Sequence, residues 1–429
     1  MKTFPAIVTG IFLVLAIGAV IIFATFSATN RNAIGTLVIW GTVPHEVFDT
    51  LLGDLGTGNN NYVGVSYQVV REEELIPQLV EAIAAGKGPD LVLFPGKNLL
   101  GQADKLQSIS YSAMSRRDFE NTFIQAGDSF LTAGGILGFP FTVDPLVMYW
   151  NQSLFANAGI AQAPRFWDEI SDITPKLTKA DKNGTLTESA VSFGTWKNVE
   201  HAKEILLSIL YQLGNPVIAS KDNGGYQSVF LNQSGGATLP ADSTLRFYTD
   251  FANPSKPLYS WNSSESDSHD AFVGGELATY FGFASELIGI RAANPNLDFD
   301  VATVPAIRGG GQSAYANVMA LSIPRGAKNP SGALIVAAAL TSKSSEESLT
   351  GILHQPSVRR DVSPPSSADP YAVVFRNAAL SAFTFLDPNP TATDSIFERM
   401  VENVSSGKLQ VSEATINANQ ELQALVGVQ

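Results

Sequence analysis

Short apolar segments alternate with helical patterns near the start of the chain. The segment "TLVIW" (36–40) precedes a loop and a helix start, and "VGVSYQVV" (63–70) precedes a helical pattern that stops at Gly86. The next segment, "PDLVLFP" (89–95), is apolar on both faces, as is typical of a strand buried between helices. Strands that alternate with helices in this way predict a parallel α/β sheet.

The length of 429 residues is too great for one ordinary core, so it predicts two or three domains or one large two-lobed unit. Two late segments, "DFDVATVPAI" (298–307) and "YANVMALSIPRG" (315–326), are as apolar as the first strands. This similarity indicates that the chain returns to its first lobe after building a second. No fixed-period repeat is visible, which argues against a solenoid or propeller.

The N-terminal segment has the character of a membrane anchor. Residues 3–30 carry no charged side chain, and residues 11–26 are almost wholly apolar. About 20 such residues cross a bilayer. Lys2 supplies positive charge before the run, so the short end should be cytoplasmic and everything after Arg31 outside.

We therefore expect residues 1–34 to form one transmembrane helix that holds the protein on the cell membrane, with the rest extracytoplasmic. A secretory signal is the alternative, and its cleavage would give a secreted protein. The apolar core is long for a signal, and no convincing small-x-small cleavage site follows it.

Composition excludes several kinds of chemistry. The chain has no cysteine, which excludes disulfides, thiolate metal sites, thiol catalysis and a lipidated N-terminal cysteine. The net charge of −13 and the absence of a basic patch argue against nucleic acid as a partner. The run "DKNG" (181–184) lacks the spacing of an EF-hand calcium loop, so we expect a tight turn and no metal.

Motifs of common enzymes are also missing. The sequence has no G-x-S-x-G, no H-E-x-x-H, no Walker A and no dinucleotide fingerprint, and its four histidines are scattered. A glycosidase needs only two carboxylates, so this class of enzyme stays open as an alternative. We expect a binding protein without cofactor or catalytic residues. A membrane-tethered sensor or surface binding module is the other alternative.

Several segments, taken in order, resemble the family of extracellular solute-binding proteins that includes maltose-binding protein. They are "LVIW", "GKGPDLVLF", "GFPFTVDPLVMYWNQSLFANAGI", "PRFWDEISDITPKLTKADKNG", "AFVGGELATYFG" and "VATVP". The resemblance covers nearly everything after residue 35. It implies a periplasmic-binding-protein type II-like fold: two α/β lobes, a hinge of crossing segments and an interlobe cleft that holds the ligand.

Carried onto this chain, the resemblance places residues 35–141 and 304–342 in the first lobe. It places residues 142–303 and 343–429 in the second. It also implies a monomer that delivers a small solute, above all a sugar or oligosaccharide, to an ABC import permease. Some relatives bind other solutes, so the ligand is not inherited with the fold. Many relatives are tethered by a lipidated cysteine, for which the transmembrane anchor would be the substitute here.

A sugar site needs aromatic platforms for apolar CH faces and polar side chains for hydroxyls, at the carboxyl ends of strands. Asp144 is the strongest candidate, because the resembling family often has an acidic residue at the lobe crossing. Pro145 would hold the chain extended beside it. The alternative is a carboxylate that caps a helix or forms a hinge salt bridge.

The other candidates stand at strand ends or in loops between the expected elements. Core packing is the alternative for the aromatic members, and Trp261 could instead anchor its own loop. Tyr149 and Asn151, near the family's "YN" position, are interpreted as packing residues. The remaining predicted ligand-binding residues are Trp40, Thr42, His45, Phe94, Pro95, Trp196, Trp261, Tyr280, Phe281, Phe283, Tyr315 and Asn317.

Overall fold

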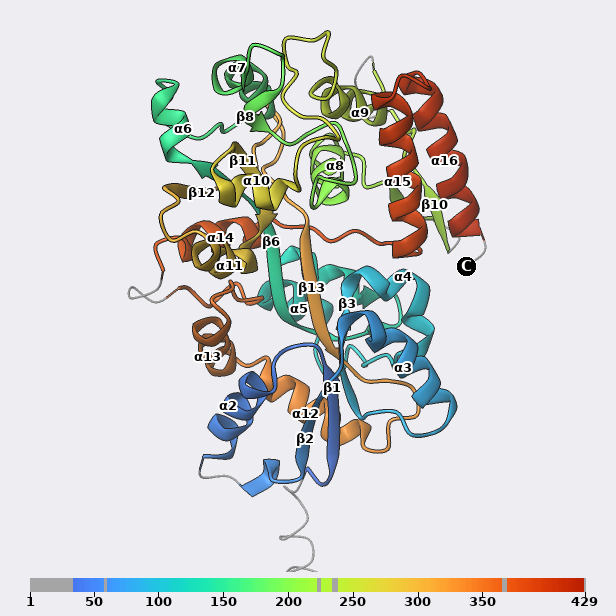
Figure 1. Ribbon diagram of the computed structural model, residues 1–429. Coiled ribbons are helices and arrows are strands. Elements are labelled where there is room, and N and C mark those ends of the chain that lie inside the picture. The colour runs from blue at the N-terminus through green and yellow to red at the C-terminus, as the bar shows by residue number, and fades with distance from the viewer. Residues whose placement is uncertain (1–33, 58–59, 222–224, 234–237, 365–368, 428–429) are drawn as a thin grey trace, which may run out of the picture.

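The computed structural model describes residues 34–57, 60–221, 225–233, 238–364 and 369–427 (Figure 1). In these residues a nine-stranded sheet has the order β2-β1-β3-β13-β6-β11-β8-β7, and β12 pairs with β6. Strands β1 (Leu37–Gly41), β2 (Val65–Val69) and β3 (Leu91–Pro95) are parallel, as the alternation with helices predicted. The helices between them are α2 (His45–Gly56) and α3 (Glu72–Ala84).

Two long strands connect the halves of the molecule. Strand β6 (Phe139–Asn151) and strand β13 (Ala316–Ser322) run between the lower and upper halves in Figure 1. The first part of β6 pairs with β13, and its second part pairs with β11 (Leu277–Phe283) and β12 (Phe299–Thr303). Asp144 stands opposite Asn317 just before β6 changes partners, so it lies at the crossing between the halves.

Each half has its own hydrophobic core. The first core draws on residues 34–143 and 316–358 with a few later side chains, and the second on residues 146–315 and 375–426. Helix α13 (Lys343–Leu353) was expected in the second lobe, yet it packs against α2 and its Leu349 lies in the first core. The position of α13 thus differs from the expected division, and the lobe boundaries as a whole remain a prediction.

Local sequence accounts for the other elements. The "AFVGGELATYFGFASELIGI" segment forms a helix, a strand and a second helix, as predicted: α10 (Ser268–Gly274), β11 and α11 (Leu287–Ala293). The "DKNG" run is the predicted tight turn, because Oδ1 of Asp181 accepts hydrogen bonds from the Asn183 and Thr185 amides at 2.8 and 2.9 Å.

The remaining helices and strands complete the two halves. The helices are α4 (Leu99–Gln102), α5 (Arg116–Thr122), α6 (Gln152–Asn157), α7 (Trp167–Leu177), α8 (Ala202–Gln212), α9 (Pro240–Asp250), α12 (Pro330–Leu340), α14 (Ala372–Leu380), α15 (Pro390–Ser405) and α16 (Val411–Gly427). The strands are β4 (Leu131–Thr132), β5 (Gly135–Ile136), β7 (Lys179–Ala180), β8 (Leu186–Val191), β9 (Ile218–Ser220) and β10 (Tyr226–Ser228).

The predicted membrane anchor, residues 1–34, falls outside the described residues except for Ile34. Among the helices that the structure describes, none combines the length and the apolar character needed to cross a bilayer.

Candidate functional site

A cavity of about 240 Å³ lies where the crossing strands meet the carboxyl ends of β1 and β3. Parallel strands end at one edge of a sheet, so the residues that follow them converge there. Four of the predicted site residues line this cavity. They are Thr42, Pro95, Asp144 and Asn317.

Asp144 is partly buried beside the second lobe. Its Oδ1 accepts a hydrogen bond from the backbone amide of Ser285, 3.0 Å away in the short 3₁₀ turn Ala284–Glu286. Burial raises the pKa of Asp144 to about 6; hydrogen bonds from Ser285 lower the pKa only in part, and the nearby Glu286 raises it further. At neutral pH the site therefore presents a carboxylate that a protein donor already orients.

A polar network supports this turn from behind. Glu286 accepts hydrogen bonds from the Phe283 amide at 2.6 Å and from the Tyr280 hydroxyl at 2.5 Å, and it lies 2.8 Å from Nε2 of His201. Burial alone would lower the pKa of His201, but the hydrogen bond and charge of Glu286 outweigh it and raise this pKa. Ser285 is thereby held in place against Asp144.

Glu200, His201 and Glu286 bring ligand atoms within 4.8 Å of one another, a spacing compatible with a metal ion. Each of the three side chains already has a partner: Glu286 faces His201, and Glu200 lies 2.7 Å from the Tyr280 hydroxyl, whose single proton it shares with Glu286. These contacts explain the cluster as a support for the turn, so we assign no metal to it.

The predicted aromatic platforms are mostly core residues. Phe94 and Tyr280 are fully buried, and Phe281 and Trp261 are each 1% exposed. The ring of Phe281 stacks on Trp167 with centroids 5.5 Å apart. No face of these rings is open to a ligand, so their prediction as sugar platforms is wrong in this structure.

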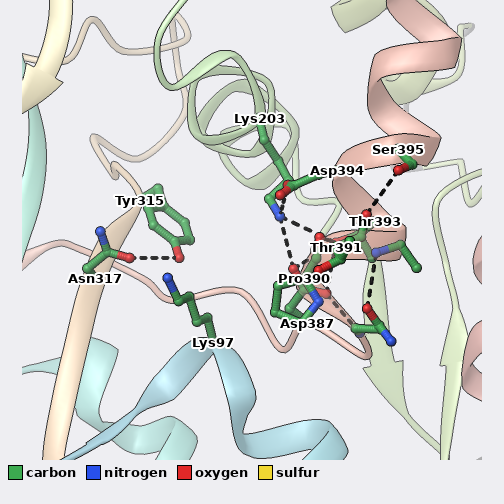
Figure 2. Close-up of polar contacts among 12 residues, drawn as sticks. Lys97, Lys203, Tyr315, Asn317, Asp387, Pro390, Thr391, Thr393, Asp394 and Ser395 are labelled. Carbon is green, nitrogen blue, oxygen red and sulfur yellow. Dashed lines mark hydrogen bonds and ion pairs between the residues drawn. The ribbon is translucent and has the colours of Figure 1, made fainter. Parts of the chain in front are cut away.

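The Phe283 and Tyr315 rings are also buried, although both stand near the crossing. The Phe283 ring lies edge-on to His201 with centroids 4.6 Å apart. The Tyr315 hydroxyl donates to Oδ1 of Asn317 at 3.2 Å, as Figure 2 shows, so it orients that amide at the cavity. Neither ring offers a face to this cavity, and the contribution of Tyr315 is the hydrogen bond that orients Asn317.

Three further predicted residues do not line this cavity. Trp40 packs against the first core, and Trp196 packs against the second, where its amide donates to Glu402 at 3.0 Å. His45 is exposed at the start of α2, with its Nδ1 2.7 Å from Oδ2 of Asp49.

Two larger cavities continue the first one on either side. A cavity of about 510 Å³ lies between α3 and the start of α15 and shares Glu72 and Lys97 with the central cavity. A cavity of about 650 Å³ lies on the opposite side and shares Gln355 with it. The three cavities adjoin at these shared residues and are lined by both halves of the molecule, and we call this set of cavities the interlobe groove.

One end of the groove carries paired charges. Nζ of Lys97 contacts Oε1 of Glu72 at 2.6 Å in the first half. On the facing half, Lys203 reaches from α8 to Asp387 at 3.1 Å and to Thr393 at 3.3 Å, as Figure 2 shows. These charges are satisfied within the protein, so this end of the groove is polar without a free ion.

Sequence reasoning missed Lys97, Thr142 and Gln355 in the lining of the central cavity. Lys97 lies two residues after the end of β3, so the strand-end argument that selected Pro95 could have found it. Gln355 had no local signal, because only the tertiary fold brings the segment after α13 beside β1 and β3.

Two α/β halves joined by crossing strands, with a groove between them, define the architecture of a solute-binding protein. The chain belongs to the family of bacterial extracellular solute-binding proteins, whose sequence pattern matches residues 56–373. Membership in this family makes it a binding protein rather than an enzyme.

Particular relatives are distant in sequence. A protein of Brucella abortus (strain 2308), named as a binding protein, is 24% identical over 278 residues, a match that spans 63% of this chain and 62% of that relative. An ABC transporter solute-binding protein from Thermotoga lettingae, bound with alpha-D-tagatose, superposes with a TM-score of 0.67 at 23% identity, covering 92% of this chain and 100% of that one.

A cyclic alpha-maltosyl-1,6-maltose binding protein from Arthrobacter globiformis superposes with a TM-score of 0.74 at 17% identity. The superposition covers 92% of this chain and 99% of that one. At these identities the structural likeness establishes the two-lobed fold and leaves the ligand of this chain to its own site.

Proposed function

We propose that this protein captures a sugar or oligosaccharide in the interlobe groove and delivers it to an ABC import permease. The observation that carries the proposal is the position of Asp144, an oriented carboxylate at the lobe crossing inside a groove that both halves line. A carboxylate accepts two hydroxyl donors, and charged hydrogen bonds of this kind contribute about 1.5 to 3 kcal/mol each. The sugars named for the structural relatives support the same class of ligand.

The mechanism is a shift of population between open and closed forms. A ligand that contacts both halves favours the closed form, and the permease would recognise that form. The hinge would consist of β6 and β13, since these strands carry the chain between the two cores. The lobe division of the sequence analysis is retained as part of this proposal, with α13 moved to the first lobe and residues 304–315 to the second.

Residues 1–34 would supply the attachment to the membrane, with the binding lobes outside the cell membrane and the protein acting as a monomer. The supporting observation is the uncharged, apolar run in the sequence. Mass spectrometry of the protein from membranes distinguishes an intact N-terminus from a cleaved one.

A thermal-shift screen of the full chain against mono- and oligosaccharides, polyols, amino acids and phosphate esters tests the ligand class. A ligand at 100 times its Kd stabilises the folded state by about 2.7 kcal/mol. Small-angle scattering then tests the mechanism, because closure reduces the radius of gyration. If the ligand that binds causes no compaction, the mechanism is wrong; if no sugar binds, the ligand class is wrong.

A further inference from the structure

The 650 Å³ cavity of the interlobe groove differs in chemistry from the rest of the groove. It lies between α11 and α14 on one side and the end of α13 with the segment after it on the other, and Figure 1 shows α11 and α14 above α13. Apolar side chains dominate its lining. They include Leu287, Ile288, Pro356, Val362 and Phe375.

The charged side chains at this cavity are used by the protein. Arg291 pairs with Asp369 and lies over the ring of Tyr371, 5.2 Å from its centroid. Arg376 donates to the carbonyl oxygens of Val362 and Arg360, the latter at 2.8 Å. Neither of these two arginines is therefore free to bind an anionic ligand.

The hydroxyl groups at the cavity are also engaged. The Ser357 hydroxyl donates to Glu346 at 2.7 Å, and the Thr350 hydroxyl donates to the Glu347 carbonyl at 3.0 Å. A bare sugar ring placed against the apolar side chains of this cavity would give up water without gaining hydrogen bonds from them, and that exchange is unfavourable. An apolar group would instead gain free energy by entering it.

The apolar cavity adjoins the polar one at Asp144. Gln355 lines both cavities. Leu287 follows two residues after Ser285, whose amide binds Asp144. Hence one molecule with a polar part at Asp144 can place an attached group in the apolar cavity.

We propose that this cavity is a subsite for an apolar aglycone, so that the ligand is a glycoside carrying an alkyl or aryl group. This inference rests on the proposed function, because it needs a sugar in the polar part of the groove. Exposed Ile288, with 54% of its surface accessible, forms the part of the wall that a ligand can reach without disturbing the core.

The test measures Kd by calorimetry for the free sugar and for the methyl, butyl and hexyl glycosides of glucose, maltose and mannose, each below its micelle concentration. Each methylene that enters the cavity should tighten Kd by about fourfold. For the sugar that binds, the hexyl glycoside should therefore bind at least about tenfold more tightly than the methyl glycoside. The readout is this hexyl-to-methyl ratio.

The Ile288→Asn variant should lower that ratio by about threefold or more, because it places an amide in the apolar wall. Ile335→Asn is the matched control: Ile335 is 55% exposed, and its helix α12 lines none of the three cavities. The ratio should stay unchanged there, which shows that the effect of Ile288→Asn comes from its place in the cavity wall and not from the loss of an exposed isoleucine.

The outcomes separate the two proposals. If sugars bind but chain length has no effect, the subsite is wrong and the proposed function stands. If the gradient persists in Ile288→Asn, the alkyl chain binds elsewhere and the subsite is wrong. If neither sugars nor glycosides bind, the proposed function fails and the subsite fails with it.

Discussion

Asp144 and Ser285 join the lobe crossing to the second half of the molecule. Oδ1 of Asp144 accepts the Ser285 amide at 3.0 Å, while the Asp144 backbone stands opposite Asn317 on β13. The Asp144 side chain is thus held by the second half of the molecule, whereas its backbone pairs with β13 at the crossing. A ligand bound to this carboxylate would contact the hinge itself.

Removing this carboxylate should weaken ligand binding. We expect Asp144→Ala to raise the Kd for the sugar by about tenfold or more, which is about 1.4 kcal/mol, because the charged hydrogen bonds are lost. Calorimetry with the ligand from the thermal-shift screen measures this. Asp172→Ala, at an exposed position on α7, is the control. Unchanged affinity of Asp144→Ala would remove Asp144 from the site.

Binding should also depend on pH. Burial raises the pKa of Asp144 to about 6, so the carboxylate is ionised at pH 7.5 and largely protonated at pH 5. We expect the wild type to bind the sugar less tightly at pH 5 than at pH 7.5, because a protonated carboxyl loses the charged hydrogen bonds. In Asp144→Asn this part of the pH dependence should be missing. An identical pH profile in both proteins would contradict the assignment.

The ionised carboxylate of Asp144 should also lower the free energy of unfolding. Its folded pKa of about 6 exceeds the ordinary 3.8, so the folded state holds this proton more tightly between these pH values. The free energy of unfolding therefore falls as pH rises through this window and stays lower above it. We expect Asp144→Asn to gain stability relative to the wild type between pH 4 and 7, on the order of 1 to 3 kcal/mol.

Urea unfolding at pH 4 and at pH 7 measures this gain. Asn keeps the acceptor for the Ser285 amide, so the substitution isolates the charge. A stability difference that is the same at both pH values would show that the charge of Asp144 costs nothing.

Glu346 should show a similar effect at higher pH. Its side chain is fully buried on α13, its Oε1 has no hydrogen-bond partner among the residues that the structure describes, and burial raises its pKa to about 8. Because the folded pKa exceeds the ordinary value of 4.5, the free energy of unfolding falls as pH rises toward 8 and the buried carboxyl loses its proton. We expect Glu346→Gln to be more stable than the wild type at pH 8.5 and less different at pH 5.

Glu347→Gln is the matched control for Glu346, since Glu347 is the next residue of the same helix and is exposed. Chemical denaturation at both pH values gives the comparison. If both variants show the same pH dependence relative to the wild type, the buried carboxyl is not its source.

Lys203 should be a strong determinant of stability. Its Nζ lies 3.1 Å from Asp387, whose side chain is 2% exposed (Figure 2). We expect Lys203→Met to cost about 3 to 5 kcal/mol, because it leaves a buried carboxylate without its cation. Lys203→Met with Asp387→Leu should recover part of that loss. Arg308→Met, which breaks an exposed ion pair with Asp168, should have a much smaller effect.

Thermal and chemical unfolding of these variants give the comparison. Equal losses for Lys203→Met and Arg308→Met would contradict the role of burial in the Lys203 pair.

The alternation of strands and helices was predictable because it depends on local patterns. Apolar runs such as 89–95 identify a buried strand from its own residues, and the same holds for the helix, strand and helix of 268–293. Positions beside the expected strands selected Thr42, Pro95 and Asn317, and the resemblance to solute-binding proteins selected Asp144; all four line one cavity. Each of these residues stands beside or within a strand whose direction the sequence indicates.

The exposure of aromatic rings was not predictable, because segments distant in the sequence decide it. Phe281 was expected as a platform, but Trp167 and Phe193 cover it from other elements. Gln355 reaches the groove from a segment after α13, and Ser285 reaches Asp144 across 141 positions of the chain.

The sequence by itself thus determined the α/β class and the order of the elements, since these follow from periodicity, and its resemblance to a family pointed to an aspartate at the crossing. Only the tertiary structure decided which side chains face the groove. Burial and hydrogen-bond partners are set by packing between distant segments, and no local pattern in the chain contains that information.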